Sequence, residues 1–282
     1  MEYVKRQKVP LLLQENQEVW TQPWVQYYRR IKGEDNQLLT PNKPTTSHWL
    51  KDEIRRPLIE DFQNNCGYCG RVIPTPYSFE NEEPLAKGDV DHLIPKSVKP
   101  ELVYEWSNYV WSSKESNQQK GNFYDEEFPI LDPCSESDCN LVRFDEATGK
   151  YVLNQAYTED PVAKQRLEFT AQKTMMNAEE LSTERRNHIA LLTGEIDSLS
   201  NALKIREIFK GTADFEQASS VQKTMEKQIK TTSDNLDALL QPQSYKLLTI
   251  NQFKYALANC DDKVKQFLQD NLSFPQDPEI FD

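Results

Sequence analysis

The segment between residues 64 and 124 constrains the fold most, because it lacks the periodic apolar pattern that predicts helices on both sides of it. Short apolar pieces alternate there with turn-forming sequences such as Asn64-Asn65-Cys66, Pro74-Thr75-Pro76 and Lys87-Gly88. Clusters of Gly, Pro and Asn of this kind favour loops and short strands. We therefore expect small strands and loops around a functional site, with helices before and after them.

Apolar periodicity predicts two helices before this segment. We expect residues 1–15 to be extended and a first helix to begin near Pro23, since proline suits a first helical turn, and to end at Gly33. A second helix is expected over 47–63. Its apolar side chains recur every fourth residue, at Leu50, Ile54, Leu58 and Phe62. Prolines, Asn and Thr between the two helices predict a loop over 34–46.

The chain beyond Asp160 is expected to be helical. One seam of apolar residues, spaced three and four apart, consists of Ile189, Leu192, Ile196, Leu199 and Leu203. Such a seam belongs either to an ordinary amphipathic core helix or to a helix that pairs with a partner, and the sequence leaves both open. Further helices are expected over about 216–231, 244–258 and 261–271.

Charge is distributed unevenly along the 282 residues. The net charge is −12, and residues 125–160 contain 10 Asp or Glu against 2 Lys or Arg. The remainder is near neutral, so that it would bind nucleic acid only weakly on its own. We expect the acidic stretch to be a solvated surface. Alternatively, it keeps non-cognate nucleic acid away from the functional site, or it binds a basic partner. Within it, residues 143–144 and 151–153 flank a turn and predict a hairpin.

No signal for a membrane or for secretion is visible. No apolar run approaches the roughly 20 residues that a membrane span needs, and Leu11-Leu12-Leu13 is too short for the core of a signal peptide. Five cysteines are too few for a disulfide scaffold at this length and fit a reducing compartment. We therefore expect a cytoplasmic protein without a membrane partner.

The types and spacing of Asp91, His92 and Asn117 point to phosphodiester hydrolysis. This reaction needs an activated water and a metal that stabilises charge on the leaving oxygen. Histidine is the natural base near neutral pH, and Mg²⁺ takes a few carboxylate or amide oxygens and keeps several waters. Asp91 and His92 would point to opposite faces of a strand, yet both can border one site at a strand end. Lys96 and Lys120 are either phosphate contacts or solvated side chains.

Together these residues resemble the HNH endonuclease motif. The matching run is Asp91-His92-Leu93-Ile94-Pro95-Lys96-Ser97, then Asn108, then Asn117-Gln118-Gln119-Lys120-Gly121. The resemblance implies a β-hairpin and a helix around one metal ion, the ββα-metal arrangement. His92 would be the general base, and Asn108 would tie the loop to the backbone. Asp91 and Asn117 would hold Mg²⁺ or Mn²⁺. Asp89 is either a supporting carboxylate or a surface residue.

A closer resemblance covers roughly residues 1–160. It rests on residues 4–10, Trp20, 100–108, 120–121 and 128–133. In these segments the chain resembles the PtuB family, the HNH subunit of Septu and of related retron-associated antiphage systems. The resemblance implies a role in defence against phage. It also implies a partner ATPase of the ABC/SMC-like type, PtuA.

The chain departs from many HNH proteins at its cysteines. Those proteins carry a second Cys-x-x-Cys before the final asparagine, whereas Ser113 and Ser116 stand here, and serine hydroxyls are poor zinc ligands. A structural zinc site would have to combine Cys66 and Cys69 with Cys134 and Cys139. The alternative is that these residues are reduced thiols in a zinc-free relic of the site. In either case the catalytic metal would be a separate ion.

We therefore predict an α+β, mainly helical protein with three regions. Residues 1–63 would form an N-terminal arm and helices that dock a partner, 64–160 the HNH core with its acidic hairpin, and 161–282 a C-terminal helical region. The predicted function is that of a metal-dependent endonuclease acting on DNA, with RNA as the alternative substrate. The rival hypothesis is a catalytically silent HNH-like module that binds a partner or nucleic acid, which the serines at 113 and 116 favour.

Overall fold

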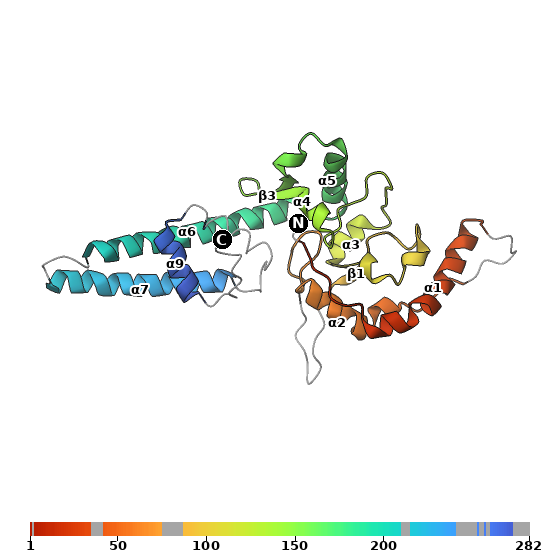
Figure 1. Ribbon diagram of the computed structural model, residues 1–282, viewed down its shortest axis with the longest axis horizontal. Helices are drawn as coiled ribbons and strands as arrows, with labels where there is room; N and C mark the ends of the chain where they lie inside the picture. Colours follow the sequence, from red (N-terminus) through yellow and green to blue (C-terminus); the bar gives the residue numbers. More distant parts are fainter. Residues whose placement is uncertain are drawn as a thin grey trace. The chain divides into compact units, whose positions relative to one another are not determined.

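The fold is mainly helical and contains two small antiparallel sheets, which confirms the predicted class (Figure 1). The computed structural model describes residues 1, 3–34, 42–74, 87–209, 215–240, 253, 257 and 260–272. The chain divides into two compact units, Met1–Asp145 with Lys150–Leu181, and Glu146–Gly149 with Ser182–Asp282. The predicted regions 1–63 and 64–160 therefore share the first unit, apart from the turn at 146–149.

The first helix, α1 (Leu11–Ile31), begins well before Pro23, so the expectation of an extended chain up to residue 15 is wrong. Pro10 stands directly before the first turn, and Pro23 lies inside the helix. An internal proline costs a backbone hydrogen bond. The helix continues through it because Leu13 and Trp24 are buried in the core of the unit.

The predicted second helix consists of two pieces, η1 (His48–Leu50) and α2 (Asp52–Asp61). Its predicted apolar positions Ile54 and Leu58 are fully buried, whereas Leu50 is exposed. The predicted loop 34–46 lies largely outside the described residues.

The irregular segment forms a hairpin followed by a helix. Strand β1 (Asp89–His92) pairs antiparallel with β2 (Tyr109–Ser112), with Asp91 opposite Val110 and His92 opposite Tyr109. Two short turns of 3₁₀ helix, η2 (Pro100–Leu102) and η3 (Trp106–Asn108), lie between the strands, and α3 (Lys114–Lys120) follows β2. All four residues of β2 are buried, so this strand is the centre of the unit.

The acidic stretch forms α4 (Glu136–Asn140) and a second hairpin of β3 (Val142–Asp145) and β4 (Lys150–Leu153). This hairpin confirms the prediction for residues 143–153. A short η4 (Gln155–Tyr157) leads to α5 (Pro161–Lys173). The Asp160 side chain accepts hydrogen bonds from the backbone of Val162 and Ala163, and Pro161 takes the first helical position.

The second unit contains most of α6 (Glu179–Phe209), together with α7 (Phe215–Leu240) and α9 (Asp262–Asn271) (Figure 1). The predicted helices over 216–231 and 261–271 are thus confirmed, and the one over 244–258 lies outside the described residues apart from Phe253 and Leu257. Four residues of the apolar seam are buried against α7 and α9: Leu192, Ile196, Leu199 and Leu203. The seam is therefore part of a core formed within this chain.

Candidate functional site

Several residues of the predicted site line one pocket of the first unit, with a volume of about 370 Å³. Its walls come from η1, from β1 and the loop after it, and from α3 with the residues that follow. The lining consists of Trp49, Leu50, Asp89, Val90, Asp91, His92, Pro95, Lys96, Asn117, Gly121 and Asn122. The pocket thus gathers two carboxylates, an imidazole, two amides and an ammonium group.

Strand β1 sets the directions of three of these side chains. Asp89 and Asp91 are two residues apart and project from the same face, because side chains alternate along a strand. His92 is the last residue of the strand. Although Asp91 and His92 are neighbours in the chain, both border the same pocket, as is possible at a strand end.

The His92 ring is held in one orientation by three contacts. Its Nε2 lies 2.9 Å from the carbonyl oxygen of Val103. The planes of the Trp49 and Tyr109 rings are nearly perpendicular to the imidazole plane, and their centroids lie 5.0 and 5.3 Å from its centroid. Since a carbonyl only accepts hydrogen bonds, Nε2 carries the proton and Nδ1 keeps its lone pair. The sequence motif predicts this histidine, but not the carbonyl that fixes its tautomer.

Electrostatics keep this imidazole neutral. His92 is only 5% exposed, and burial together with the nearby ammonium group of Lys96 lowers the pKa of His92 to about 3. The hydrogen bond to Val103 opposes this shift only in part. A neutral imidazole with a lone pair on Nδ1 is able to accept a proton at neutral pH.

Asp91 is clamped by two side chains of the same unit. Its carboxylate accepts a hydrogen bond of 2.6 Å from the Tyr68 hydroxyl. The Lys120 ammonium lies 3.0 Å from Oδ2 and 3.2 Å from Oδ1, and it also donates to the carbonyl oxygen of His92 at 2.6 Å. Burial raises the pKa of Asp91, while Lys120 and Tyr68 oppose that shift. Lys120, which the sequence offered as a phosphate contact, is 2% exposed and turned to Asp91.

Asn117 and Asp89 form a second polar pair at the pocket. Asn117 Nδ2 donates to Asp89 Oδ2 at 3.0 Å. Asn117 lies on α3, whose first turn is capped by the Ser113 side chain, which accepts from the backbone of Ser116. Sequence reasoning left Asp89 open between a supporting and a surface position. Asp89 and Asp91 are two residues apart on one strand, so their side chains share a face, and this spacing is the sequence feature that places Asp89 at the pocket.

The donor groups of this pocket suit a small, hard cation. Oxygens of Asp89, Asp91 and the Asn117 amide line it, and oxygen ligands are those that Mg²⁺ prefers. Among the described residues, no group of three or more His, Cys, Asp and Glu side chains is placed to hold a metal ion. Mg²⁺ is compatible with this sparse set, because it commonly binds through one or two carboxylates and retains water.

Asn108 ties the loop after β1 to the backbone. Its Oδ1 accepts from the backbone N–H of Ile94 at 2.8 Å, and its Nδ2 donates to the carbonyls of Ile94 and Leu102 at 3.0 and 3.1 Å. Lys96, from the same loop, lines the pocket. Its ammonium lies 5.2 Å from the ring centroid of Trp49, an attractive cation–π contact. No carboxylate of the described residues pairs directly with this lysine.

The two cysteine pairs lie in different surroundings. The Cys66 thiol lies 3.5 Å from the Ser116 hydroxyl, which is itself 3.7 Å from the Cys69 thiol. Cys139 contacts the carbonyl of Pro133 at 3.6 Å, and burial raises the pKa of Cys134 to about 12. A zinc ion bound by all four thiolates does not fit this arrangement, since the described residues contain no such ligand group.

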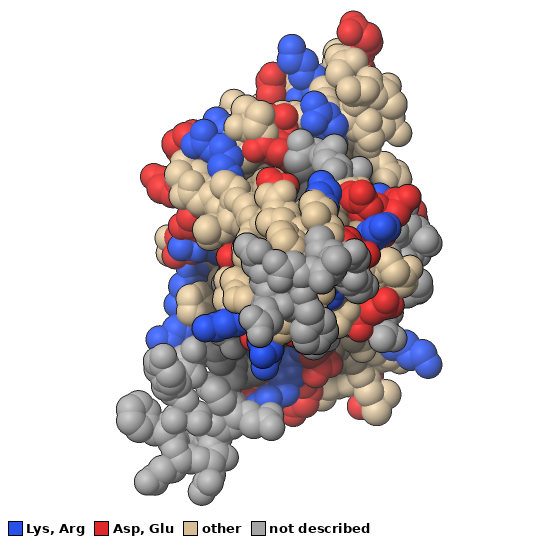
Figure 2. Space-filling model, turned by 90° about the vertical axis from the view of Figure 1, so that its left-hand side faces the viewer, with Lys and Arg blue, Asp and Glu red and all other residues tan. Residues whose placement is uncertain are grey.

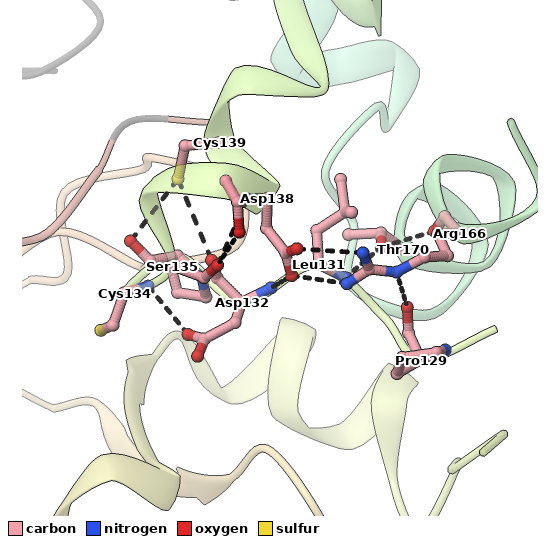
Figure 3. A network of polar contacts seen from close by, with 11 residues as sticks. Pro129, Leu131, Asp132, Cys134, Ser135, Asp138, Cys139, Arg166 and Thr170 are labelled. Atoms are coloured by element: carbon pink, nitrogen blue, oxygen red, sulfur yellow. Dashed lines mark hydrogen bonds and ion pairs between the residues drawn. The ribbon is translucent and has the colours of Figure 1, made fainter. Parts of the chain in front are cut away.

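Part of the acidic stretch is anchored to α5 (Figure 3). Asp138 accepts two hydrogen bonds from Arg166, at 2.9 and 2.5 Å, and Arg166 also donates to the carbonyl of Pro129 at 2.9 Å. The backbone of Leu131 donates to the Thr170 hydroxyl. Bidentate pairs of this kind fix geometry as well as charge. The acidic stretch is therefore not a solvated surface throughout.

Charged side chains of both signs are interspersed on the face shown in Figure 2. Lys and Arg alternate there with Asp and Glu among the described residues. A continuous basic surface is the usual footprint of a protein that binds nucleic acid tightly on its own, and this face does not present one. The mixed surface agrees with the near-neutral charge of the chain outside residues 125–160.

A β-hairpin and a following helix that carry an Asp-His pair and an Asn around one pocket form the ββα topology that the HNH resemblance implies. The chain is similar to the Septu protein PtuB of Bacillus thuringiensis, with 30% identity over 97 residues. This match covers 34% of the chain and 35% of the relative, so it spans about a third of each. No family model matches the chain, and no solved structure matches it.

None of the described helices is both long enough and apolar enough to cross a bilayer.

Proposed function

We propose that the pocket hydrolyses phosphodiester bonds of nucleic acid, with DNA as the favoured substrate and RNA as the alternative. The observation that carries this proposal is the state of His92: a neutral imidazole, bound through Nε2 to the Val103 carbonyl, at a pocket shared with Asp89, Asp91 and Asn117. The orientation of a base by a hydrogen bond on its other nitrogen is a recurring feature of hydrolytic sites.

In this proposal His92 acts as the general base. Nδ1 takes a proton from a water molecule, and the water oxygen forms a bond to phosphorus. The bond between phosphorus and the 3′-oxygen breaks, which leaves a 5′-phosphate and, after protonation of the leaving oxygen, a 3′-hydroxyl. The pKa of about 3 applies to the pocket without substrate. The negative charge of a phosphodiester beside the ring favours the imidazolium form and raises this pKa.

The carboxylate and amide oxygens would hold Mg²⁺ or Mn²⁺. Asp91 and Asn117 are the proposed ligands, and Asp89 is the further carboxylate that hydrogen bonds to Asn117. A divalent ion bound there would stabilise the negative charge that develops on the leaving oxygen. Lys96, whose ammonium lies at the pocket, is placed to meet a phosphate oxygen.

We further propose that the protein is the nuclease subunit of a Septu-like antiphage system and acts with a PtuA-like ATPase. The similarity to PtuB over about a third of the chain supports this. The charge distribution supports it as well, since a near-neutral surface binds nucleic acid weakly and gains affinity from a partner. Residues 1–63 are the proposed docking region, and a cytoplasmic location follows from this role.

The experiment incubates the purified full chain with plasmid DNA and with total RNA, in Mg²⁺, Mn²⁺ or EDTA, alone and with a PtuA-like ATPase. We expect cleavage that requires the divalent ion and leaves 5′-phosphate ends, as read by susceptibility of the products to a 5′-phosphate-dependent exonuclease. Cleavage that persists in EDTA would contradict the metal-dependent mechanism. No cleavage of either polymer, with or without the ATPase, would favour the catalytically silent module.

A further inference from the structure

Tyr68 connects the turn between Cys66 and Cys69 to the reaction pocket. Its side chain is fully buried, and its hydroxyl donates a hydrogen bond of 2.6 Å to Asp91 Oδ2. Burial and the neighbouring Asp91 carboxylate raise the pKa of Tyr68 well above its ordinary value. Because a carboxylate only accepts hydrogen bonds, the hydroxyl is the donor in this contact.

The turn that carries Tyr68 is fixed by backbone hydrogen bonds. The N–H of Gly67 donates to the carbonyl of Trp111 on β2 at 2.8 Å, and the N–H of Cys66 donates to the carbonyl of Arg71 at 2.8 Å. Gly67 has no room for a side chain, because a Cβ there would lie 2.5 Å from the ring of Phe62. The position of the Tyr68 hydroxyl is thus set by the sheet and not by a mobile loop.

The same turn also contacts α3. The thiols of Cys66 and Cys69 lie 3.5 and 3.7 Å from the hydroxyl of Ser116, the residue directly before Asn117. That hydroxyl donates to the carbonyl of Thr174 at 2.8 Å. One turn therefore supports both sides of the pocket, through the hydrogen bond of Tyr68 to Asp91 of β1 and through its contact with Ser116 of α3. It does so through hydrogen bonds, and the described residues gather no group of three or more His, Cys, Asp and Glu side chains around a metal ion here.

We propose that Tyr68 is a positioning residue, which holds the Asp91 carboxylate in the orientation that a divalent cation requires. This inference rests on the proposed function. Asp91 lines the pocket, whereas Tyr68 and Lys120 are not among its lining residues, and a carboxylate has about four acceptor sites. The remaining lone pairs are left for a cation in the pocket. Without the hydroxyl, the carboxylate turns more freely and loses one charge-assisted hydrogen bond.

The test compares the wild type with Tyr68→Phe, which keeps the ring and removes the hydroxyl. Mn²⁺ binding to the full chain is measured by isothermal titration calorimetry, which needs neither substrate nor partner. We expect binding that is weaker by about tenfold or more, in line with the loss of a hydrogen bond to a charged group. Under conditions where the wild type cleaves, the Mn²⁺ concentration for half-maximal cleavage is expected to rise by a similar factor.

Tyr104→Phe is the matched control. Tyr104 is fully buried as well, but its hydroxyl lies 3.3 Å from the carbonyl of Thr46 and does not contact Asp91. We expect its Mn²⁺ affinity to equal that of the wild type. Equal affinity in Tyr68→Phe and wild type would overturn the positioning role of Tyr68. A wild type that neither binds Mn²⁺ nor cleaves would instead overturn the proposed function, and this inference with it.

A second measurement covers the case in which Tyr68→Phe does not fold, as judged by circular dichroism. A buried hydroxyl proton in a 2.6 Å hydrogen bond exchanges slowly with water and gives its own proton resonance in the wild type. We expect the Tyr68 resonance to shift on titration with Mg²⁺, because the cation shares its acceptor. A resonance that does not move while Mg²⁺ binds would overturn the inference.

Discussion

Lys120→Met is expected to destabilise the first unit strongly, because it leaves the Asp91 carboxylate buried without its cation. Methionine has a similar length and no charge, so the apolar packing of the side chain is largely kept. The variant removes the ammonium that contacts both carboxylate oxygens of Asp91 and the carbonyl oxygen of His92. Its effect is therefore dominated by the loss of the ion pair and of the hydrogen bond to the carbonyl.

The expected magnitude follows from burial. Lys120 is 2% exposed and Asp91 is 5% exposed, so solvent screens the pair very little. Removal of one partner from a buried pair costs about 3–5 kcal/mol of the free energy of unfolding. For a unit of this size, 1 kcal/mol shifts the melting temperature by about 2–4 °C. We therefore expect a fall of about 6–20 °C, measured by differential scanning calorimetry.

The deficit of Lys120→Met is also expected to depend on pH. Burial raises the pKa of Asp91, and Lys120 opposes this, so removal of Lys120 raises that pKa further. A carboxyl whose pKa is raised in the folded state contributes its stability at low pH and loses it as the pH rises through that pKa. The difference in stability from the wild type should therefore be largest at pH 7–8 and should shrink toward pH 4.

Two controls separate this reasoning from a general packing defect. Asp91→Asn in the Lys120→Met background removes the unpaired charge and should recover part of the stability. Lys96→Met changes a lysine whose ammonium contacts the rings of Trp24 and Trp49 and no carboxylate of the described residues, so it should cost less than Lys120→Met. A Lys120→Met deficit that is small, or that is the same at pH 4 and pH 8, would refute the argument.

Three further outcomes are expected. Gly67→Ala should lower the free energy of unfolding by about 1–3 kcal/mol in urea, because its Cβ would lie 2.5 Å from the Phe62 ring; an unchanged midpoint would contradict this. Arg166→Leu should cost about 3 kcal/mol in guanidinium chloride, since it leaves the Asp138 carboxylate without its bidentate partner, and additional Asp138→Asn should recover part of the loss. The pKa of His92 is lowered to about 3 in the folded state, so His92 should contribute a loss of about 2 kcal/mol between pH 7 and pH 5, where unfolded histidine takes up a proton. His92→Gln should lose less over the same range, and equal losses would argue against the low pKa.

Local sequence patterns predict those elements that are formed by residues close together in the chain. The hairpin over 143–153 was visible because a turn separates two short apolar pieces, and the structure pairs Phe144 with Tyr151. The start of α1 does not follow from the local sequence. Pro23 favours a helix that begins there, whereas the burial of Leu13 and Trp24 in the core stabilises a helix that begins at Leu11. Tertiary packing overrode a local preference there.

The candidate site was predictable in its residue types but not in its contacts. The spacing of Asp91, His92 and Asn117 allowed a shared pocket, and these three residues line it. The pairing of Lys120 with Asp91 depends on a contact between two segments far apart in the chain, and so does the hydrogen bond from Tyr68. Neither follows from a periodicity or a short motif, since each needs the fold that joins the turn, β1 and α3.

We propose above that His92 is the general base of a nucleic-acid hydrolase. The most direct test of this role is the initial rate at which supercoiled plasmid DNA is nicked or linearised in Mn²⁺. The comparison is between wild type, His92→Ala and His188→Ala, each shown to be folded and each assayed with and without the proposed PtuA-like ATPase. His188 lies on α6 and does not line the pocket. We expect His92→Ala to lose at least about a hundredfold in rate, the usual contribution of a general base, and His188→Ala to retain the wild-type rate. Cleavage by His92→Ala at the wild-type rate would contradict the account.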